Sequence, residues 1–321
     1  MSEASWAEHI TERARAYWTE ARLAELSRDK TLLLAPIEAA PLLRALSILR
    51  ADGSIPPDRM RKYLQINHMV AVLGPSIREL IETRGTIRLL DAACGKSYLS
   101  LLLAWVLRER YRHPVQVLGV DRNEALITEV QRITQLAGLS SLVRHQAGTL
   151  EQLDVRSAWQ RAFGEAAPID GLIALHACDT ATDDAIALGV ALQCTLIAVA
   201  PCCQAELARG WASLPPSTSD AFGAVRSAPH LRRELGASIT DAMRTLLLRS
   251  VGYQVWPIEF VGSEHTPKNT LLRAMRREGG DPTQGPAEAE AGYAALVQAT
   301  GGVELSLRAR LAALAGELRH A

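Results

Sequence analysis

The sequence lacks the features that would direct a protein to a membrane or to the oxidising exterior of a cell. Its five cysteines are an odd number and two of them are adjacent, so they do not suit a disulfide framework. The N-terminal stretch has acidic residues among its first eight positions and no apolar core of a signal peptide. The longest uninterrupted apolar run, residues 101–107, is far shorter than a bilayer span. These absences predict a cytoplasmic protein with no membrane partner.

The chain also lacks an excess of charge of either sign, because Lys plus Arg and Asp plus Glu each number 35. A neutral protein is not drawn as a whole onto nucleic acid, so such a partner must be held by a local patch. Arg226, His230, Arg232 and Arg233 are candidates for a phosphate-binding patch, with a solvated helix entry as the alternative. The 321 residues are enough for one large domain with a substantial extension.

Helical patterns dominate the first part of the chain. Residues 5–50 are rich in Ala, Leu, Arg and Glu at helical spacing, which predicts two or three helices. Gly and Pro interrupt the pattern at residues 51–59, and a further helix is predicted over residues 60–84. We therefore predict an N-terminal helical extension over residues 1–59.

From residue 87 onward, short apolar runs alternate with helical patterns. This alternation predicts an α/β fold whose parallel sheet is covered by helices on both faces, because parallel strands need crossover connections. The predicted strands are residues 87–91, 115–121, 142–145, 169–176, 195–200, 253–261 and 269–276. We predict a catalytic domain over residues 60–278, with a loop or lid insertion at 204–230. A linker and a C-terminal helix are predicted over residues 279–321.

The strongest chemical signal is LLDAACGKSYLS at residues 89–100, where an acidic residue ends a strand and small residues open a helix. Small residues let the backbone approach a ligand, and the helix supplies unpaired amide groups. Ala93 and Ser97 stand where a dinucleotide-binding turn has glycines, which leaves only Gly95. Such a turn disfavours a nicotinamide or flavin pyrophosphate and suits S-adenosylmethionine better.

A second acidic strand end strengthens this hypothesis. Asp121 ends the next strand, where a carboxylate can accept hydrogen bonds from both hydroxyls of a ribose. Asp91 and Asp121 end two successive strands that one helical crossover separates. Surface charge alone does not readily explain two acidic residues at these positions. The pair therefore indicates a nucleoside-containing cofactor.

Polar and sulfur-bearing residues follow the fourth and fifth predicted strands. Ligands of open α/β sheets bind beyond the carboxyl ends of the strands, so we expect His176 and Cys202 to face the active cleft. His176, Cys178, Cys202 and Cys203 raise a zinc hypothesis, but the chain has no Cys-x-x-Cys pair. We predict that the site holds no metal.

The segment HTPKN, residues 265–269, separates the two late strands on the expected rim of the cleft. Lys268 could hold an anion there, and Asn269 could orient a base or a carbonyl group. A hairpin turn stabilised by Pro267 and Asn269 is the alternative. Cys202, Lys268 and Asn269 form the predicted substrate-binding set.

Four motifs together resemble the methyltransferase-32 group, which is similar to the eukaryotic tRNA 2′-O-methyltransferases that act on the acceptor stem. They are DAACGKSYLS at residue 91, HACDTATDDA at residue 176, APCC at residue 200 and, more loosely, KYLQ at residue 62. The resemblance covers about residues 60–275 and implies a Rossmann-like class I methyltransferase with a seven-stranded mixed sheet. Asp179 departs from the group's pattern, which has Gly at that position, and the zinc-finger segments of the tRNA enzymes are missing.

The resemblance and the strand-end residues together predict a methyltransferase that uses S-adenosylmethionine. Asp91 and Gly95 would shape the methionine pocket, Asp121 would hold the ribose, and the stretch after the third strand would flank adenine. The predicted cofactor-binding set is Asp91, Ala93, Gly95, Asp121, Arg122, Thr149, Leu150 and His176.

His176 is also the predicted catalytic residue, either as a base or by positioning the acceptor. RNA is the preferred acceptor and a protein side chain is the second. The alternatives are an inactive S-adenosylmethionine- or nucleotide-binding scaffold and an NAD-dependent oxidoreductase.

Overall fold

The computed structural model describes residues 3–27, 32–175, 177, 179–201, 204–215, 222–259, 270–277 and 285–320. The chain divides into two compact units, Met1–Ala167 and Pro168–Ala321, and each is described by itself. The domain boundaries predicted from the sequence, after residues 59 and 278, stay predictions. No helix within the described ranges has both the length and the apolar character that crossing a bilayer requires.

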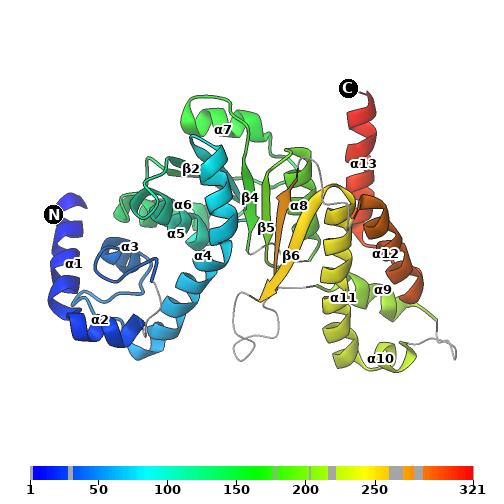
Figure 1. Cartoon of the computed structure of the whole chain (residues 1–321), viewed down its shortest axis with the longest axis horizontal. Coiled ribbons are helices and arrows are strands. Elements are labelled where there is room, and N and C mark those ends of the chain that lie inside the picture. The colour runs from blue at the N-terminus through cyan, green and yellow to red at the C-terminus, as the bar shows by residue number, and fades with distance from the viewer. Residues whose placement is uncertain are drawn as a thin grey trace. The chain divides into compact units, whose positions relative to one another are not determined.

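The N-terminal unit holds helices that precede and connect three strands (Figure 1). Its elements are α1 Glu3–Tyr17, α2 Glu20–Ser27, α3 Ala40–Ala45, α4 Pro57–Thr83, β1 Ile87–Ala92, α5 Tyr98–Glu109, β2 Val115–Asp121, α6 Glu124–Leu136, β3 Val143–Ala147 and α7 Val155–Phe163. The strands lie in the order β3-β2-β1, and each neighbouring pair is parallel.

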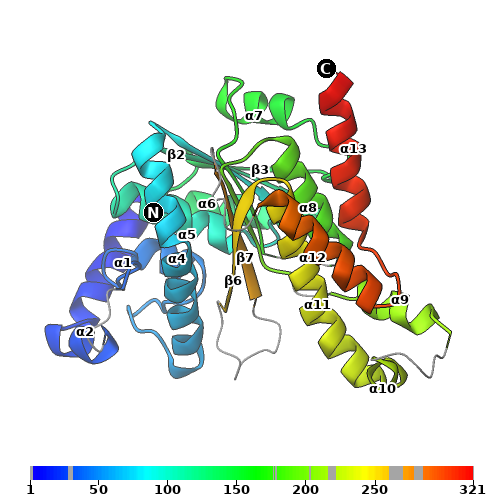
Figure 2. The same ribbon diagram turned by 45° about the vertical axis from the view of Figure 1, so that its right-hand side comes forward.

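The C-terminal unit holds four strands and the remaining helices. Its elements are β4 Gly171–Ala174, α8 Thr180–Ala191, β5 Leu196–Val199, α9 Glu206–Ser213, α10 Gly223–Ser227, α11 Pro229–Ser250, β6 Tyr253–Glu259, β7 Thr270–Arg276, α12 Pro286–Ala299 and α13 Ser306–His320. The strands lie in the order β4-β5-β7-β6. β4 and β5 are parallel, whereas β7 is antiparallel to both of its neighbours. Figure 2 shows α11 running beside the β6–β7 pair, against which it packs.

The strands together make up a seven-stranded mixed sheet, which confirms the predicted Rossmann-like α/β fold. β4 and β5 are buried along their whole length, as expected for parallel strands covered on both faces. Helix α5 is apolar around most of its circumference, and every residue from Leu99 to Leu107 is buried. A helix of that composition belongs in the interior of the fold.

Residues 204–230 contain two helices in their described part, α9 and α10, where the sequence suggested a loop or lid insertion. Trp211 on α9 is buried, and its indole N–H donates to the Thr300 carbonyl at 3.0 Å. Gly210 weakens the helical pattern in the sequence. Glycine is nevertheless required there, because a Cβ would lie only 2.5 Å from Val303 Cγ1. The C-terminal stretch likewise forms two helices, α12 and α13, where one was expected.

A buried ion network holds α11 against α8. The Arg244 guanidinium is fully buried and donates to Asp183 Oδ1 at 2.7 Å, to Asp241 Oδ1 at 3.3 Å and to the Asp179 carbonyl at 2.9 Å. Asp183 is also fully buried, so each charge depends on the other for stabilisation.

We expect Arg244→Met to lower the free energy of unfolding by about 3 to 5 kcal/mol, because it leaves the Asp183 carboxylate buried without a cation. Urea unfolding at pH 7 measures this loss. The matched control is Arg308→Met, which breaks a half-exposed pair with Glu290 and should cost about 1 kcal/mol or less. Equal losses for the two variants would contradict the prediction.

Candidate functional site

The loop after β1 is tightly wound, and it contains the small-residue motif found in the sequence. Ala93, Gly95 and Ser97 have φ angles of 55°, 53° and 50°. Positive φ is uncommon for residues that carry a Cβ, so this backbone must be held by its surroundings. The Cys94 N–H donates to the Val120 carbonyl at 2.9 Å, and the Ser97 N–H donates to the Cys94 carbonyl at 2.7 Å.

The Asp121 carboxylate joins this loop to the end of β2. The Gly95 N–H donates to Asp121 Oδ2 at 2.9 Å, and the Asn123 N–H donates to Oδ1 at 3.0 Å. A carboxylate oxygen has two lone-pair positions, so both oxygens of this half-buried side chain can accept a further bond from a ligand. The Gly148 N–H donates to the Asp121 carbonyl at 3.0 Å, which brings the turn after β3 to the same place.

Asp91, at the end of β1, is a buried carboxyl group near this junction. Burial raises the pKa of Asp91 to about 7, and the nearby charge of Asp121 adds to that effect. The hydroxyl of Ser100 donates to the carboxyl group and opposes the rise. The unit therefore places two acidic groups close together, and no cation among the described residues balances Asp91, which favours a positively charged ligand.

Gly119 of β2 and His145 of β3 pack against Cys94 of this loop. A Cβ on Gly119 would lie 2.8 Å from His145 Cδ2 and 3.1 Å from Cys94 Sγ, so only glycine leaves enough room. Burial lowers the pKa of His145 to about 4, which keeps the ring neutral at pH 7. The ring nitrogen Nε2 lies 3.0 Å from Ser97 Oγ. Burial also raises the pKa of the Cys94 thiol above its ordinary value.

The N-terminal helices reach the same loop through Lys62. Its ammonium group donates to the Tyr98 hydroxyl at 2.9 Å and lies 4.0 Å from the centre of the ring. Tyr98 is the first residue of α5, directly after the loop, and its hydroxyl donates to the Leu46 carbonyl at 3.5 Å. The lysine of the KYLQ motif thus helps to hold the first turn of α5.

Asp179 follows β4 with φ 52° and ψ −116°, a backbone conformation that favours glycine. Its carboxylate accepts the Ala205 N–H at 2.9 Å and the Glu206 N–H at 3.2 Å, and it pairs with Arg209. Burial opposes ionisation, but these bonds outweigh it and hold the pKa of Asp179 below its ordinary value. The aspartate that replaces the group's glycine therefore gains specific partners for its side chain.

The structure brings together one part of the predicted site. Asp91, Gly95 and Asp121 converge at the ends of β1 and β2, and the turn bearing Thr149 and Leu150 is bonded to Asp121 through Gly148. Ala93 belongs to the same loop, and the Arg122 side chain beside Asp121 is exposed.

The predicted residues His176, Cys202, Lys268 and Asn269 lie outside the described residues, as do Cys178 and Cys203. Within the described part of the chain no group of three His, Cys, Asp or Glu could hold a metal ion. The absence of zinc at the four His and Cys positions stays a prediction.

Sequence reasoning missed the residues that support the loop, namely Ser97 with His145, and Ser100 with Asp91. One signal was available, because a glycine inside an apolar strand often marks a close approach of other atoms. Gly119 in β2 is such a glycine.

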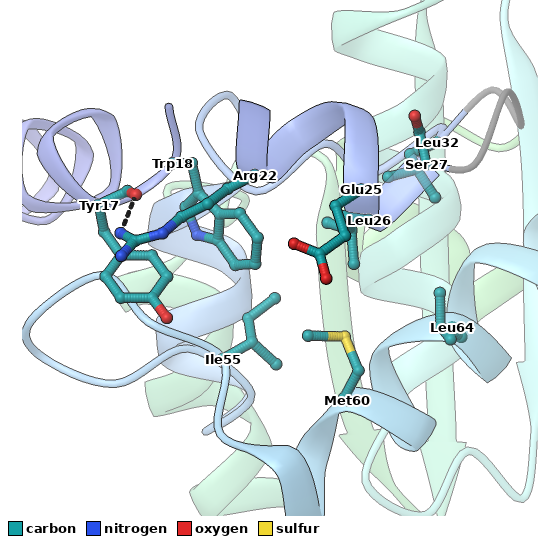
Figure 3. Close-up of a pocket in the computed structure, with 10 residues that line it drawn as sticks. All are labelled: Tyr17, Trp18, Arg22, Glu25, Leu26, Ser27, Leu32, Ile55, Met60 and Leu64. Atoms are coloured by element: carbon teal, nitrogen blue, oxygen red, sulfur yellow. Dashed lines mark hydrogen bonds between the residues drawn. The ribbon is translucent and has the colours of Figure 1, made fainter. Parts of the chain in front are cut away.

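A cavity of about 500 Å³ lies among the N-terminal helices, between α2 and the first turns of α4 (Figure 3). Arg22 folds back over the Tyr17 ring at 4.3 Å and donates to the Tyr17 carbonyl at 2.6 Å. Ile55 and Met60 point toward the space between the helices. None of the residues that line this cavity belongs to a strand end, so it is separate from the Asp91–Asp121 junction.

Residues 61–210 match the family model Methyltransf_32, which is described as a methyltransferase domain. The matched segment contains the loop after β1, Asp121 and the turns after β4 and β5. It supports a methyltransferase, with S-adenosylmethionine as cofactor, and gives no support to the NAD-dependent oxidoreductase alternative. No curated protein sequence matches the chain.

Solved structures with a similar course of the chain include two methyltransferases that contain S-adenosylhomocysteine. The O-methyltransferase from Bacillus cereus is 15% identical, with a TM-score of 0.40, and the match covers 82% of this chain and 99% of that chain. The methyltransferase PaMTH1 from Podospora anserina is 10% identical, with a TM-score of 0.39, and the match covers 84% and 97%. Because these scores are low, the fold assignment rests on the strand order described above.

We expect Asp91→Asn to stabilise the protein above pH 7 in the absence of ligand. The folded-state pKa of about 7 lies above the ordinary value of 3.8, so the folded protein binds the extra proton between these values. Stability from this group is therefore fully present below about pH 4 and is lost as the pH rises to 7. The variant should exceed the wild type by about 1 to 4 kcal/mol at pH 8 and match it near pH 4.

Urea unfolding at pH 4.5, 6.5 and 8 measures this difference. Asp58→Asn is the control, because that side chain is 73% exposed and should leave the pH profile unchanged. A loss of stability in Asp91→Asn that is the same at all three pH values would refute the assignment.

Proposed function

We propose, on the premise that residues 61–210 belong to the Methyltransf_32 family of methyltransferase domains, that this protein methylates RNA with S-adenosylmethionine. The proposal that the cofactor is S-adenosylmethionine rests on the junction of Asp91, Gly95 and Asp121 in the N-terminal unit. The proposal that RNA is the acceptor rests on the basic residues in the first turns of α11, in the C-terminal unit.

The residues at the junction fit the chemical groups of S-adenosylmethionine. Asp121 has two unused lone-pair positions, which suit the two ribose hydroxyls. Asp91 has no balancing cation in the described part of the chain, which suits the positively charged methionine part beside the Gly95 backbone. Thr149 and Leu150 would flank adenine from the turn after β3, with Ala93 and Arg122 at the edge of the pocket.

When bound, S-adenosylmethionine supplies an electrophilic methyl group on a sulfonium ion. The residues of this chain would contribute chiefly by holding the acceptor in line with that methyl group, since alignment can account for much of the rate of such a transfer. We assign this positioning to His176, which follows β4, with Cys202, Lys268 and Asn269 as further acceptor contacts. A role of His176 as a base is the alternative.

RNA is the acceptor best supported by the surface of the C-terminal unit. Helix α11 begins without an acidic residue in its first turn and without a side-chain cap, and it carries His230 and Arg232 there, followed by Arg233. Cations at a helix N-terminus oppose the helix dipole, so this arrangement favours a bound anion such as phosphate. The neutral charge of the whole chain makes this a local attraction.

The proposal is tested with methyl-labelled S-adenosylmethionine, the purified full-length protein and separate RNA and protein fractions from cells. We expect label in the RNA fraction, with no transfer when the protein is heat-inactivated. Label confined to the protein fraction would replace RNA by a protein side chain as the acceptor. Binding of S-adenosylhomocysteine without transfer to either fraction would instead support an inactive scaffold.

We expect Asp121→Ala to weaken binding of S-adenosylhomocysteine by about 5- to 150-fold, or about 1 to 3 kcal/mol, since it removes the acceptor of the ribose hydroxyls. Calorimetric titration measures the affinity. Glu124→Ala is the control, because it removes an exposed carboxylate three residues away. A folded Asp121→Ala variant with unchanged affinity would remove Asp121 from the cofactor site.

A further inference from the structure

Two acidic side chains meet at the start of the C-terminal helix α13. Glu206 is the first residue of α9, Asp183 lies in α8, and Ser306 is the first residue of α13. Glu206 Oε1 accepts the Ser306 N–H at 2.7 Å, and Asp183 Oδ2 accepts the Ser306 hydroxyl at 3.2 Å. Two carboxyl groups on one small residue must lie side by side. We call Asp183, Glu206 and Ser306 the α13 latch.

One oxygen of the α13 latch has no hydrogen-bond donor. Glu206 Oε2 is buried and makes no hydrogen bond to any described residue. Asp183 beside it is fully buried and accepts bonds from Arg244 and Ser306. Two ionised carboxylates cannot bond to each other, because both can only accept. A proton on Glu206 Oε2 resolves this conflict, since the resulting hydroxyl donates to Asp183 and one of the two like charges disappears.

The charged groups around Glu206 do not balance its carboxylate. The buried Arg244 of α11 is shared by Asp183 and Asp241, so one guanidinium already serves two acids. Burial raises the pKa of Glu206 above its ordinary value, and the neighbouring charge of Asp183 adds to the rise, whereas the bonds from Ser306 oppose it. The cluster therefore favours a bound proton on Glu206.

The other polar and charged side chains around the α13 latch are engaged elsewhere. Tyr293 of α12 accepts the Leu305 N–H on its hydroxyl at 3.1 Å, and burial raises the pKa of Tyr293, which keeps it neutral at pH 8. Glu304 adds a further negative charge near Tyr293. The remaining groups are bonded in pairs, namely Gln204 with Asp241, Arg209 with Asp179, Arg308 with Glu290 and Arg310 with Asp184.

We propose that one proton, held between Glu206 Oε2 and Asp183, fastens the start of α13 to α8 and α9, and that this attachment loosens as the pH rises and the proton passes to the solvent. The inference does not depend on the proposed methyl transfer. When α13 is detached, Glu206 is solvated and has its ordinary pKa of 4.5. The raised pKa of the attached state therefore favours attachment fully below about pH 4.5, and this advantage is lost as the pH rises to that raised value.

The test is hydrogen–deuterium exchange of the full-length protein at pH 5, 6.5 and 8, measured in peptides from α13 and corrected for the intrinsic rate at each pH. Glu206→Gln places an NH₂ group that donates to Asp183 at every pH, while its amide oxygen still accepts the Ser306 N–H. The variant and the wild type should match at pH 5. At pH 8, α13 should exchange at least about 5-fold faster in the wild type than in the variant.

The control is Glu290→Gln, which breaks the half-exposed pair with Arg308 of α13. Any change that it causes in α13 exchange should be the same at all three pH values. If Glu206→Gln fails to fold, Glu206→Met decides, because it removes both the acceptor of the Ser306 N–H and the proton. It should exchange faster than the wild type at pH 5 and show a smaller rise from pH 5 to pH 8.

Equal α13 exchange in the wild type and Glu206→Gln at pH 8 would overturn the proposal, as would a difference of the same size at all three pH values. Asp241 is the rival, because burial raises its pKa to about 6. If Asp241→Asn abolishes the pH dependence of α13 exchange and Glu206→Gln keeps it, the proton belongs to Asp241 and the proposal fails.

Discussion

The hydrogen bond from the Gly95 N–H to the Asp121 carboxylate is the contact on which the proposed cofactor site depends. It fixes a loop with three positive φ angles to the end of the neighbouring strand, and it orients the carboxylate for a further ligand bond. Gly119 and His145 pack against Cys94 and Ser97 of the loop, while Lys62 holds Tyr98, the first residue of α5. The local strain of the loop is thus offset by contacts from β2, β3 and α4.

Asp183 and Asp91, two buried acids in different units, differ in whether a cation accompanies them. In the C-terminal unit Asp183 is paired with Arg244, and Asp179 accepts two backbone N–H groups and pairs with Arg209, so these charges stabilise the fold. In the N-terminal unit Asp91 has a hydroxyl partner and no cation beside it among the residues that the structure describes, and its pKa rises to about 7. A buried acid without a balancing charge is costly unless a ligand supplies one, which is why it marks a functional site better than its paired counterparts.

The sequence predicted most of the sheet because buried parallel strands and their crossover helices leave strong local patterns, and it predicted the junction because Asp91, Gly95 and Asp121 lie at strand ends. Two of the residues it missed act through distant partners. Ser97 meets His145, and Gln204 meets Asp241, although 48 and 37 positions separate them. Helix α9 was missed because Gly210 interrupts its pattern, and that glycine is explained only by Val303, which packs against it. Contacts between residues so far apart leave no periodic pattern in the sequence.

The position of β7 between β5 and β6 has a consequence for how the chain is made. β5 pairs with β7 from Leu196 opposite Met275 to Val199 opposite Leu272. About seventy residues must therefore be synthesised after β5 before β7 can pair with this edge. At the usual speed of translation that takes roughly 4 to 14 s. Until then β5 presents an unpaired edge of four apolar residues, LIAV, which can pair with another nascent chain. Slow synthesis or truncation before residue 270 should therefore favour aggregation through β5.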